Sequence, residues 1–270
     1  MPGARSSSSS SSASARPWPP VSEPPLSAPR RIAIVPARNE EGAIGLVVAE
    51  IRAFDPGLDV LVIDDGSVDR TAARAAEAGA TVVRLPFNLG IGGAVQTGFM
   101  YALAHGYELA VRLDGDGQHD PSELPKLIEP VLRGDADIVV GSRFAAPPFD
   151  GDTDSYRPPL ARRAGIRFFA GIVSLLVRQR VTDTTSGFQA LNGKGIRLFA
   201  DDYPHDYPEV EATVMVVKHR LRLLEVPVLM REREHGSSSI TALRSAYYVL
   251  KVTLALLVGV FRRKAVPARD

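Results

Sequence analysis

The sequence predicts an α/β protein with a mostly parallel central sheet and helices on both of its faces. Two observations predict this class: short apolar runs alternate with helical stretches, and each run is followed by a polar segment, several of them rich in glycine. Ligands of such sheets bind beyond the carboxyl ends of the strands. We therefore expect the functional residues at the strand ends.

The alternation starts at residue 32 and continues to residue 140. Short runs rich in β-branched residues predict strands at Ile32–Val35, Val60–Ile63, Thr81–Leu85, Leu109–Leu113 and Ile138–Val140. Apolar residues at helical spacing predict helices at Glu41–Phe54, Asp69–Ala78, Ile91–His105 and Ser122–Leu132. Strand and helix follow each other in turn, as in repeated crossover units with parallel neighbours.

The composition excludes several classes of protein. The 270 residues include no cysteine, which rules out disulfide scaffolds, cysteine-ligated metal sites and thiol nucleophiles. The 32 Lys and Arg balance 31 Asp and Glu, so the net charge of +1 gives no reason to expect nucleic-acid binding. We expect an intracellular protein or one at a membrane face.

The two ends of the chain differ in composition from its centre. Residues 1–30 hold ten Ser and seven Pro, which predicts a disordered tail, and no apolar stretch of secretory-signal type follows the early arginines. The central unit then spans residues 31–239. Residues 240–270 form a basic segment around the apolar run Val252–Phe261.

That C-terminal run predicts a membrane contact. Its ten residues are too few for a spanning helix, which needs about 20, and basic residues flank it. An amphipathic helix lying on an anionic membrane surface is the preferred interpretation, and a core helix is the alternative. The run Phe168–Val177 is also short and flanked by arginines, so it predicts a second interfacial helix.

Polar motifs follow all five expected strands. They are Pro36-Ala-Arg-Asn-Glu40, Asp64-Asp-Gly-Ser-Val-Asp-Arg-Thr71, Asn88-Leu-Gly-Ile-Gly-Gly93, Asp114-Gly-Asp-Gly-Gln-His119 and Gly141-Ser-Arg143. Parallel strands present their carboxyl ends at one edge of the sheet, so these motifs should meet there.

Asp114 and Asp116 predict a site for a hard cation such as Mg²⁺ or Mn²⁺. Two carboxylates at i and i+2, separated by glycine, can converge on one ion and leave coordination positions for phosphate oxygens. An EF-hand loop does not fit, because its glycine position holds His119 and its glutamate position holds Pro125. A solvated acidic turn is the alternative.

Together these motifs resemble family 2 glycosyltransferases of the Rossmann-like GT-A fold, in the branch of dolichyl- and polyprenyl-phosphate-sugar synthases. Two further motifs add to the resemblance, Ser186-Gly-Phe188 and Arg233-x-x-Gly-x-Ser238, and all seven occur in family order over about 200 residues. The resemblance implies an inverting, metal-dependent enzyme that moves a sugar from a GDP- or UDP-linked donor to a polyprenyl phosphate.

The resemblance also assigns residues to the donor. It places the nucleotide against Pro36, Ala37, Asn39, Glu40, Asp64, Asp65, Ser67 and Asp114, and the metal on Asp114, Asp116 and Gln118. Asp69 and Thr71 are better explained as helix-capping residues, because an aspartate at a helix start satisfies backbone N–H groups without any ligand.

For the acceptor, the resemblance implies arginines and no general base. A phosphate monoester is already anionic near neutral pH, so it needs cations that position it. Arg143, Arg163 and Arg233 are the candidates for the acceptor or diphosphate, and Arg143 and Asp116 are the expected catalytic residues. The branch further implies the cytoplasmic face of a membrane and leaves room for a separate membrane subunit.

Two other functions remain open. A family 2 enzyme that glycosylates a saccharide hydroxyl in cell-envelope polysaccharide synthesis would need a base, for which Asp183, Glu209 and Glu211 are candidates. A sugar-phosphate nucleotidyltransferase would use a similar sheet, but it usually carries a longer Gly-rich, basic loop after its first strand than residues 36–40 provide.

Overall fold

The computed structural model describes residues 29–144, 171, 174, 182–183, 186–204 and 208–231. Residues 1–28 of the predicted tail, nearly all of the run Phe168–Val177 and the whole C-terminal segment 240–270 lie outside these residues. The two interfacial helices and the domain boundaries therefore remain predictions.

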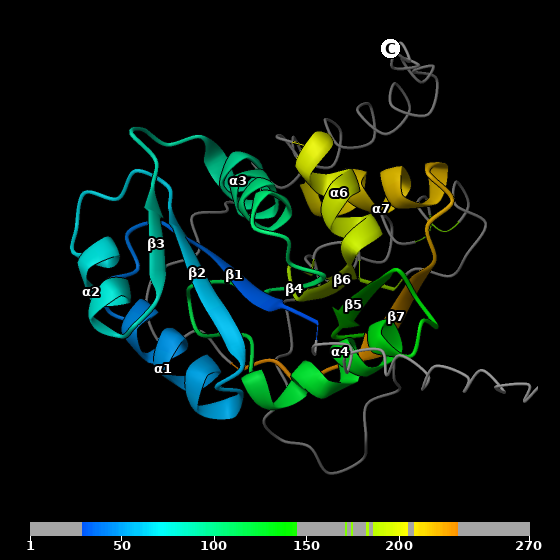
Figure 1. The fold of residues 1–270 in the computed structure, drawn as a ribbon, viewed down its shortest axis with the longest axis horizontal. Coiled ribbons are helices and arrows are strands. Elements are labelled where there is room, and N and C mark those ends of the chain that lie inside the picture. Colours follow the sequence, from blue (N-terminus) through cyan, green and yellow to red (C-terminus); the bar gives the residue numbers. More distant parts are fainter. Residues whose placement is uncertain are drawn as a thin grey trace, which may run out of the picture.

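The described residues form one seven-stranded sheet in the order β3-β2-β1-β4-β6-β5-β7 (Figure 1). The strands are β1 Arg31–Ala37, β2 Leu58–Asp64, β3 Thr81–Arg84, β4 Leu109–Arg112, β5 Ile138–Ser142, β6 Gln189–Asn192 and β7 Leu223–Pro227. All neighbours pair in parallel except β6, which runs antiparallel to both β4 and β5. The predicted mostly parallel sheet is confirmed.

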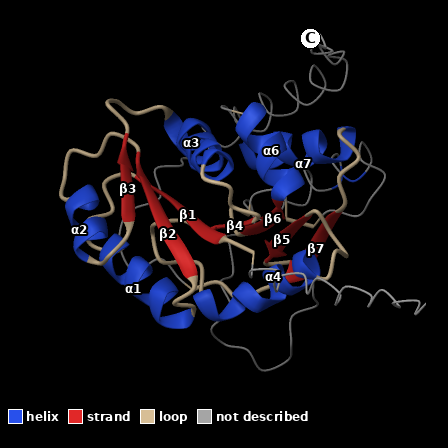
Figure 2. Cartoon of the chain, in the orientation of Figure 1, coloured by secondary structure: helices blue, strands red, loops and turns tan. Residues whose placement is uncertain are grey.

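Helices cover both faces of the sheet (Figure 2). Their bounds are α1 Ile44–Phe54, α2 Thr71–Glu77, α3 Gly90–Ala104, α4 Leu124–Leu132, α6 Gly193–Asp201 and α7 Pro208–Lys218. Helices α1, α2 and α4 lie on one face, and α3, α6 and α7 lie on the other.

Strand β1 shows why the sheet needs both layers. Ala33 and Val35 belong to the apolar cluster under α1 and α4, whereas Ile32 and Ile34 belong to the cluster under α3 and α6. Successive side chains of a strand point to opposite faces, so a strand buried on both sides reads as a continuous apolar run. That run is what the sequence shows at residues 32–35.

All five predicted strands and four predicted helices are present, with ends shifted by a few residues. Strands β6 and β7 were not predicted. Polar residues interrupt both: β6 begins with Gln189 and ends with Asn192, whose side chain caps α6 by accepting the N–H of Lys194 at 2.9 Å. The centre of β7 is Glu225. Their pairing partners are distant in sequence, so local pattern does not reveal them.

The topology creates a crevice beside β1. The connection through α1 leads from β1 to β2, and the connection through α3 returns across the opposite face to β4. Strand order thus reverses at β1, and in open α/β sheets ligands bind at this point, beyond the carboxyl ends of the strands.

Candidate active site

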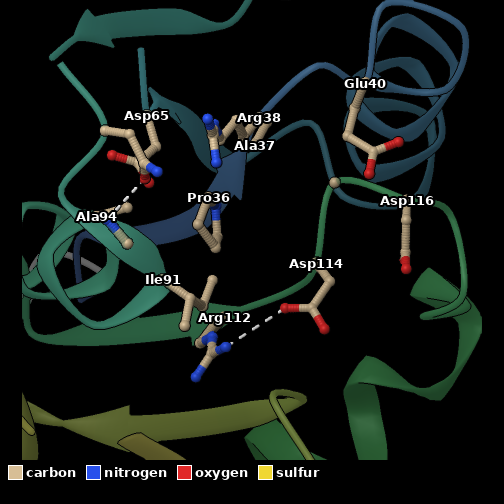
Figure 3. Close-up of a pocket in the computed structure, with 13 residues that line it drawn as sticks. Pro36, Ala37, Arg38, Glu40, Asp65, Ile91, Ala94, Arg112, Asp114 and Asp116 are labelled. Atoms are coloured by element: carbon tan, nitrogen blue, oxygen red, sulfur yellow. Dashed lines mark hydrogen bonds and ion pairs between the residues drawn. The ribbon is translucent and has the colours of Figure 1, made fainter. Parts of the chain in front are cut away.

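A pocket of about 370 Å³ opens at this crevice, between the ends of β1 and β4 (Figure 3). Figure 3 draws Asp65 and Arg38 on one side of it and Glu40, Asp114 and Asp116 on the other. Its lining comprises Pro36, Ala37, Arg38, Glu40, Asp65, Asn88, Gly90, Ile91, Ala94, Arg112, Asp114, Gly115 and Asp116. Six residues predicted for the nucleotide or the metal are among them.

The loops after β1 and β2 are fastened to each other by reciprocal hydrogen bonds. The backbone N–H of Asn39 donates to Ser67 Oγ at 2.9 Å, and the N–H of Val68 donates to Asn39 Oδ1 at 3.0 Å. Glu40 N–H likewise donates to Thr71 Oγ1 at 2.8 Å. Asn39 adopts a positive φ of 54°, which asparagine tolerates better than most residues.

Asn39 and Ser67, both predicted to bind the nucleotide, therefore join the two loops and do not line the pocket. Asp69 accepts the N–H of Thr71 at 3.0 Å, at the start of α2, as the helix-capping interpretation expects. Burial acts to raise the pKa of Asp69, but hydrogen bonds from the Thr71 hydroxyl and backbone N–H bring that pKa below its ordinary value.

Asp64 and Asp65 have different environments although they are adjacent. Asp64 is fully buried; its carboxylate accepts Ser67 N–H at 3.1 Å and Arg84 Nε at 3.2 Å, and it does not line the pocket. Asp65 lines the pocket and accepts Leu89 N–H at 2.7 Å. Of this predicted pair, only Asp65 can reach a ligand in the pocket.

Asp114 and Asp116 follow β4 on a glycine-containing turn. Gly117 adopts a φ of +81°, and a Cβ on Gly115 would lie 3.0 Å from the side chain of Ala37. The backbone N–H of Gln118 donates to Asp116 Oδ1 at 3.1 Å. Both carboxylates border the pocket, whereas Gln118, the third predicted metal ligand, does not line it.

His119 holds the backbone of Asp114. Its Nδ1 accepts the Asp114 N–H at 2.9 Å, its Nε2 lies 3.8 Å from Asp114 Oδ2, and its ring stacks on Phe188 with centroids 4.7 Å apart. Burial lowers the pKa of His119 below its ordinary value. A neutral ring with its proton on Nε2 fits these contacts, so His119 orients the loop.

Asp114 is ionised in this setting. Burial opposes ionisation, but the neighbouring Arg112 guanidinium favours the charged carboxylate, and the pKa of Asp114 lies below its ordinary value. An ionised carboxylate bordering a pocket is available for a cation or for hydroxyl donors.

Arg143, at the end of β5, forms a bidentate ion pair with Asp183. Nε and Nη2 donate to the two carboxylate oxygens at 2.8 and 3.0 Å, and the Asp183 side chain is fully buried. Glu225 of β7 supports the pair from behind, since it accepts the N–H groups of Thr182 at 2.8 Å and Asp183 at 3.2 Å. Two predicted residues with separate roles are thus bonded to each other.

The remaining predicted residues contribute less to the described site. Arg163 and Arg233 lie outside the described residues, as does the side chain of Glu209. Glu211 belongs to α7 and does not line the pocket. Arg231, two residues before Arg233, pairs with Glu50 at 2.7 Å and Asp120 at 3.1 Å.

Two arginines that line the pocket, Arg38 and Arg112, were not predicted from the sequence. Arg38 stands inside a motif whose other members were assigned. Arg112 interrupts the apolar strand β4, and its side chain is only 1% exposed. A charged residue within an apolar run next to a two-carboxylate motif was the available signal.

The described residues hold neither a preformed metal cluster nor a helix that could cross a membrane. No three His, Cys, Asp or Glu side chains in them converge as a preformed metal site. In the same part of the chain, no helix combines the length and the apolar character needed to cross a bilayer.

Comparison with known proteins supports the motif analysis. The pattern of glycosyl transferase family 2 matches residues 32–195. The undecaprenyl-phosphate mannosyltransferase of Micrococcus luteus is 32% identical over 78% of this chain and 88% of its own length. The UDP-N-acetylglucosamine–dolichyl-phosphate N-acetylglucosaminyltransferase of Methanococcus voltae is 27% identical over 84% of this chain and 95% of its own length.

A solved structure shares the fold. Glucosyl-3-phosphoglycerate synthase from Mycobacterium tuberculosis, in complex with Mn²⁺, UDP-glucose and phosphoglyceric acid, superposes with a TM-score of 0.60. It is 21% identical and covers 87% of this chain and 82% of its own length. With the family pattern, the motif order and the pocket in agreement, this chain belongs to glycosyl transferase family 2 and is an enzyme of the glycosyltransferase type.

Proposed function

We propose that this enzyme transfers a sugar from a GDP- or UDP-linked donor to a polyprenyl phosphate, with a divalent cation and with inversion at the anomeric carbon. The observation that carries the proposal is the pocket at the β1–β4 crevice, which Asp65 borders on one side and the Asp114–Asp116 pair on the other. The two relatives above act on undecaprenyl and dolichyl phosphates, which supports the same acceptor class here.

The residues present suit Mg²⁺ or Mn²⁺. Asp114 and Asp116 offer oxygen ligands from one turn and border the same pocket. Because no third acidic or histidine side chain in the described residues completes the site, the other positions suit diphosphate oxygens. The cation would neutralise charge on the departing nucleoside diphosphate.

The nucleotide fits the side of the pocket formed by the β1 and β2 loops. Asp65 and Glu40 can accept hydrogen bonds from ribose hydroxyls or base N–H groups. The bonds of Asn39 and Ser67 fix these loops before a ligand arrives, which reduces the entropy lost on binding.

The acceptor role falls to Arg143. Its guanidinium is held in one orientation by Asp183, and its side chain remains 14% exposed. Both Asp183 oxygens accept guanidinium bonds, an arrangement that suits a positioning role better than proton abstraction. A phosphate acceptor needs no such abstraction, because it is already ionised.

The proposed transfer is a single displacement. A phosphate oxygen of the acceptor forms a bond to the anomeric carbon from the side opposite the leaving group. The bond from that carbon to the diphosphate oxygen breaks, and its electron pair stays on the diphosphate. One displacement inverts the configuration, and in-line geometry requires the donor and acceptor to be held on opposite sides of the carbon.

The membrane part of the proposal comes from sequence alone. The runs Phe168–Val177 and Val252–Phe261 would place the acceptor side at the cytoplasmic face of a membrane. A separate membrane subunit stays a prediction of the family resemblance.

The test is a donor screen with purified enzyme, Mg²⁺ or Mn²⁺ and a short-chain polyprenyl phosphate, measuring nucleoside diphosphate release with and without the lipid. Lipid-dependent release with one donor is expected. Release that requires a saccharide hydroxyl instead would overturn the acceptor assignment, and release of pyrophosphate would indicate a nucleotidyltransferase.

A further inference from the structure

Arg112 is an unusual residue for the centre of a sheet. It lies in β4 between Val111 and Leu113, both fully buried, and its own side chain is only 1% exposed. Burying a guanidinium is costly unless it is paired and hydrogen-bonded. The neighbouring residues therefore have to hold it in a defined place.

The back of the guanidinium is held by Tyr203. Arg112 Nη1 donates to Tyr203 Oη at 3.1 Å. The Tyr203 side chain is 1% exposed and packs edge-on against Phe199, with ring centroids 5.0 Å apart, and against Phe99 at 5.9 Å. A phenol enclosed by two aromatic rings has little freedom to move, so it fixes the guanidinium.

The front of the guanidinium faces the pocket and Asp114. Arg112 Nη2 lies 3.5 Å from Asp114 Oδ1, while the other carboxylate oxygen points away from the guanidinium (Figure 3). A Cβ on Gly187 would lie 2.9 Å from each of these two atoms, Nη2 and Oδ1. The ion pair thus occupies the space that a side chain at residue 187 would take.

We propose that Arg112 is a positioning residue that fixes the Asp114 carboxylate for the cation and donor. Arg112 lies against Oδ1, so it would keep the Asp114 carboxylate in one orientation toward the pocket in which a cation would bind. This inference rests on the proposed function, since it assigns Asp114 a cation to bind. It also explains the glycine of the Ser186-Gly-Phe188 motif, because a side chain at Gly187 would displace the ion pair.

The proposal predicts opposite changes in cation binding and turnover. In R112Q a positive charge next to the cation site is lost, so the protein should bind Mn²⁺ about threefold more tightly. The carboxylate also loses its fixed orientation, so nucleoside diphosphate release should fall about tenfold. A merely structural role would weaken both together.

The binding measurement uses Mn²⁺ alone, followed through the electron paramagnetic resonance signal of the free ion, and circular dichroism checks the fold. R222Q is the matched control, because it removes a paired arginine at the opposite edge of the sheet and should leave Mn²⁺ binding unchanged. Equal or weaker Mn²⁺ binding by folded R112Q would overturn the inference. Failure of the wild-type enzyme to bind Mn²⁺ would instead remove the proposed metal site itself.

Two further variants keep the charge and disturb only the geometry. Y203F removes the hydroxyl behind Arg112, and G187A introduces a methyl group where the ion pair lies. Both should release nucleoside diphosphate several-fold more slowly without tighter Mn²⁺ binding. Y107F, which loses a hydrogen bond to Asp59 at 2.7 Å, is the control. Wild-type rates of nucleoside diphosphate release in both Y203F and G187A would overturn the inference. This test holds even if R112Q does not fold.

Discussion

Two aspartates beside arginines, at opposite edges of the same sheet, have opposite surroundings. Asp137, where β5 starts, accepts hydrogen bonds from the backbone N–H and the guanidinium of Arg222 and from the side chain of Asn192, at 2.9 to 3.2 Å. The carboxylate of Asp114, where β4 ends, lies farther from its neighbours, 3.5 Å from Arg112 and 3.8 Å from His119, and it borders a pocket.

The difference separates structural carboxylates from ligand-binding ones. Asp137 connects three strands, because Arg222 precedes β7 and Asn192 ends β6, and its side chain is 4% exposed. Its hydrogen-bonding capacity is used within the protein. Asp114 and Asp116 instead border the pocket, at the edge where parallel sheets bind ligands.

The substitution with the largest expected effect is at the carboxyl ends of the strands, where Asp114 and Asp116 border the pocket. D116N removes one negative charge from the cation site and should reduce nucleoside diphosphate release by about 100-fold or more, the loss typical of one electrostatic group. The melting temperature should stay within about 2 °C of wild type, because a substitution of this kind outside the core changes stability little. D135N, at an exposed aspartate away from the pocket, is the control. Full activity in D116N would remove the metal assignment.

The Arg143–Asp183 pair sharpens the comparison, because it is an ion pair within the protein like Asp137–Arg222, but Arg143 follows the carboxyl end of β5. R143Q should raise the KM for the lipid phosphate and so slow transfer about 50-fold. The reason is that losing one partner of a desolvated charge pair, here Arg143 with the acceptor phosphate, costs about 2–5 kcal/mol of binding free energy. D183N should show a smaller loss in the same parameter. Steady-state kinetics with varied lipid and varied donor separate the two KM values. If R143Q raised only the KM for the donor, Arg143 would be assigned to binding the donor diphosphate instead of the acceptor.

The sequence predicts which strand ends form the pocket, but it does not predict the contacts of every polar side chain there. Pro36, Glu40, Asp65 and Asp114 of the strand-end motifs line the pocket, because parallel topology brings strand ends together. Asn39 turns out to bond a neighbouring loop. Which polar side chain faces the pocket depends on backbone angles that no local pattern fixes.

Arg112 and the Asp137 network were missed for a related reason. Their meaning depends on residues far away in sequence, such as Tyr203 for the first and Arg222 for the second. The antiparallel strand β6, which places Asn192 beside Asp137, was also not predicted. Contacts of this kind require the tertiary structure.

The next largest effect is expected at the opposite ends of the strands, where Asp137 lies before β5. D137N should lower the free energy of unfolding by about 2 kcal/mol, because it leaves a network of hydrogen bonds to a charged group incomplete. The exposed position of Arg222, whose side chain is 54% accessible, limits the loss, since water can solvate the freed guanidinium. Urea unfolding measures it. Activity per folded molecule should remain that of wild type, and a large loss of turnover would break the distinction between the two edges.

The smallest expected effect is the pH dependence of the stability that Asp137 contributes to the folded protein. Hydrogen bonds from Arg222 hold the pKa of Asp137 well below its ordinary value, so the folded protein keeps this carboxylate ionised at pH values where the unfolded chain protonates it. A depressed folded pKa gives stability that is complete above the unfolded value of about 3.9 and is lost as the pH falls below it. The difference in unfolding free energy between wild type and D137N should therefore be constant from pH 7 to about 5 and shrink below about 4. If the difference in unfolding free energy between wild type and D137N instead grew on acidification, Asp137 would not be the ionised acceptor of the hydrogen bonds from Arg222.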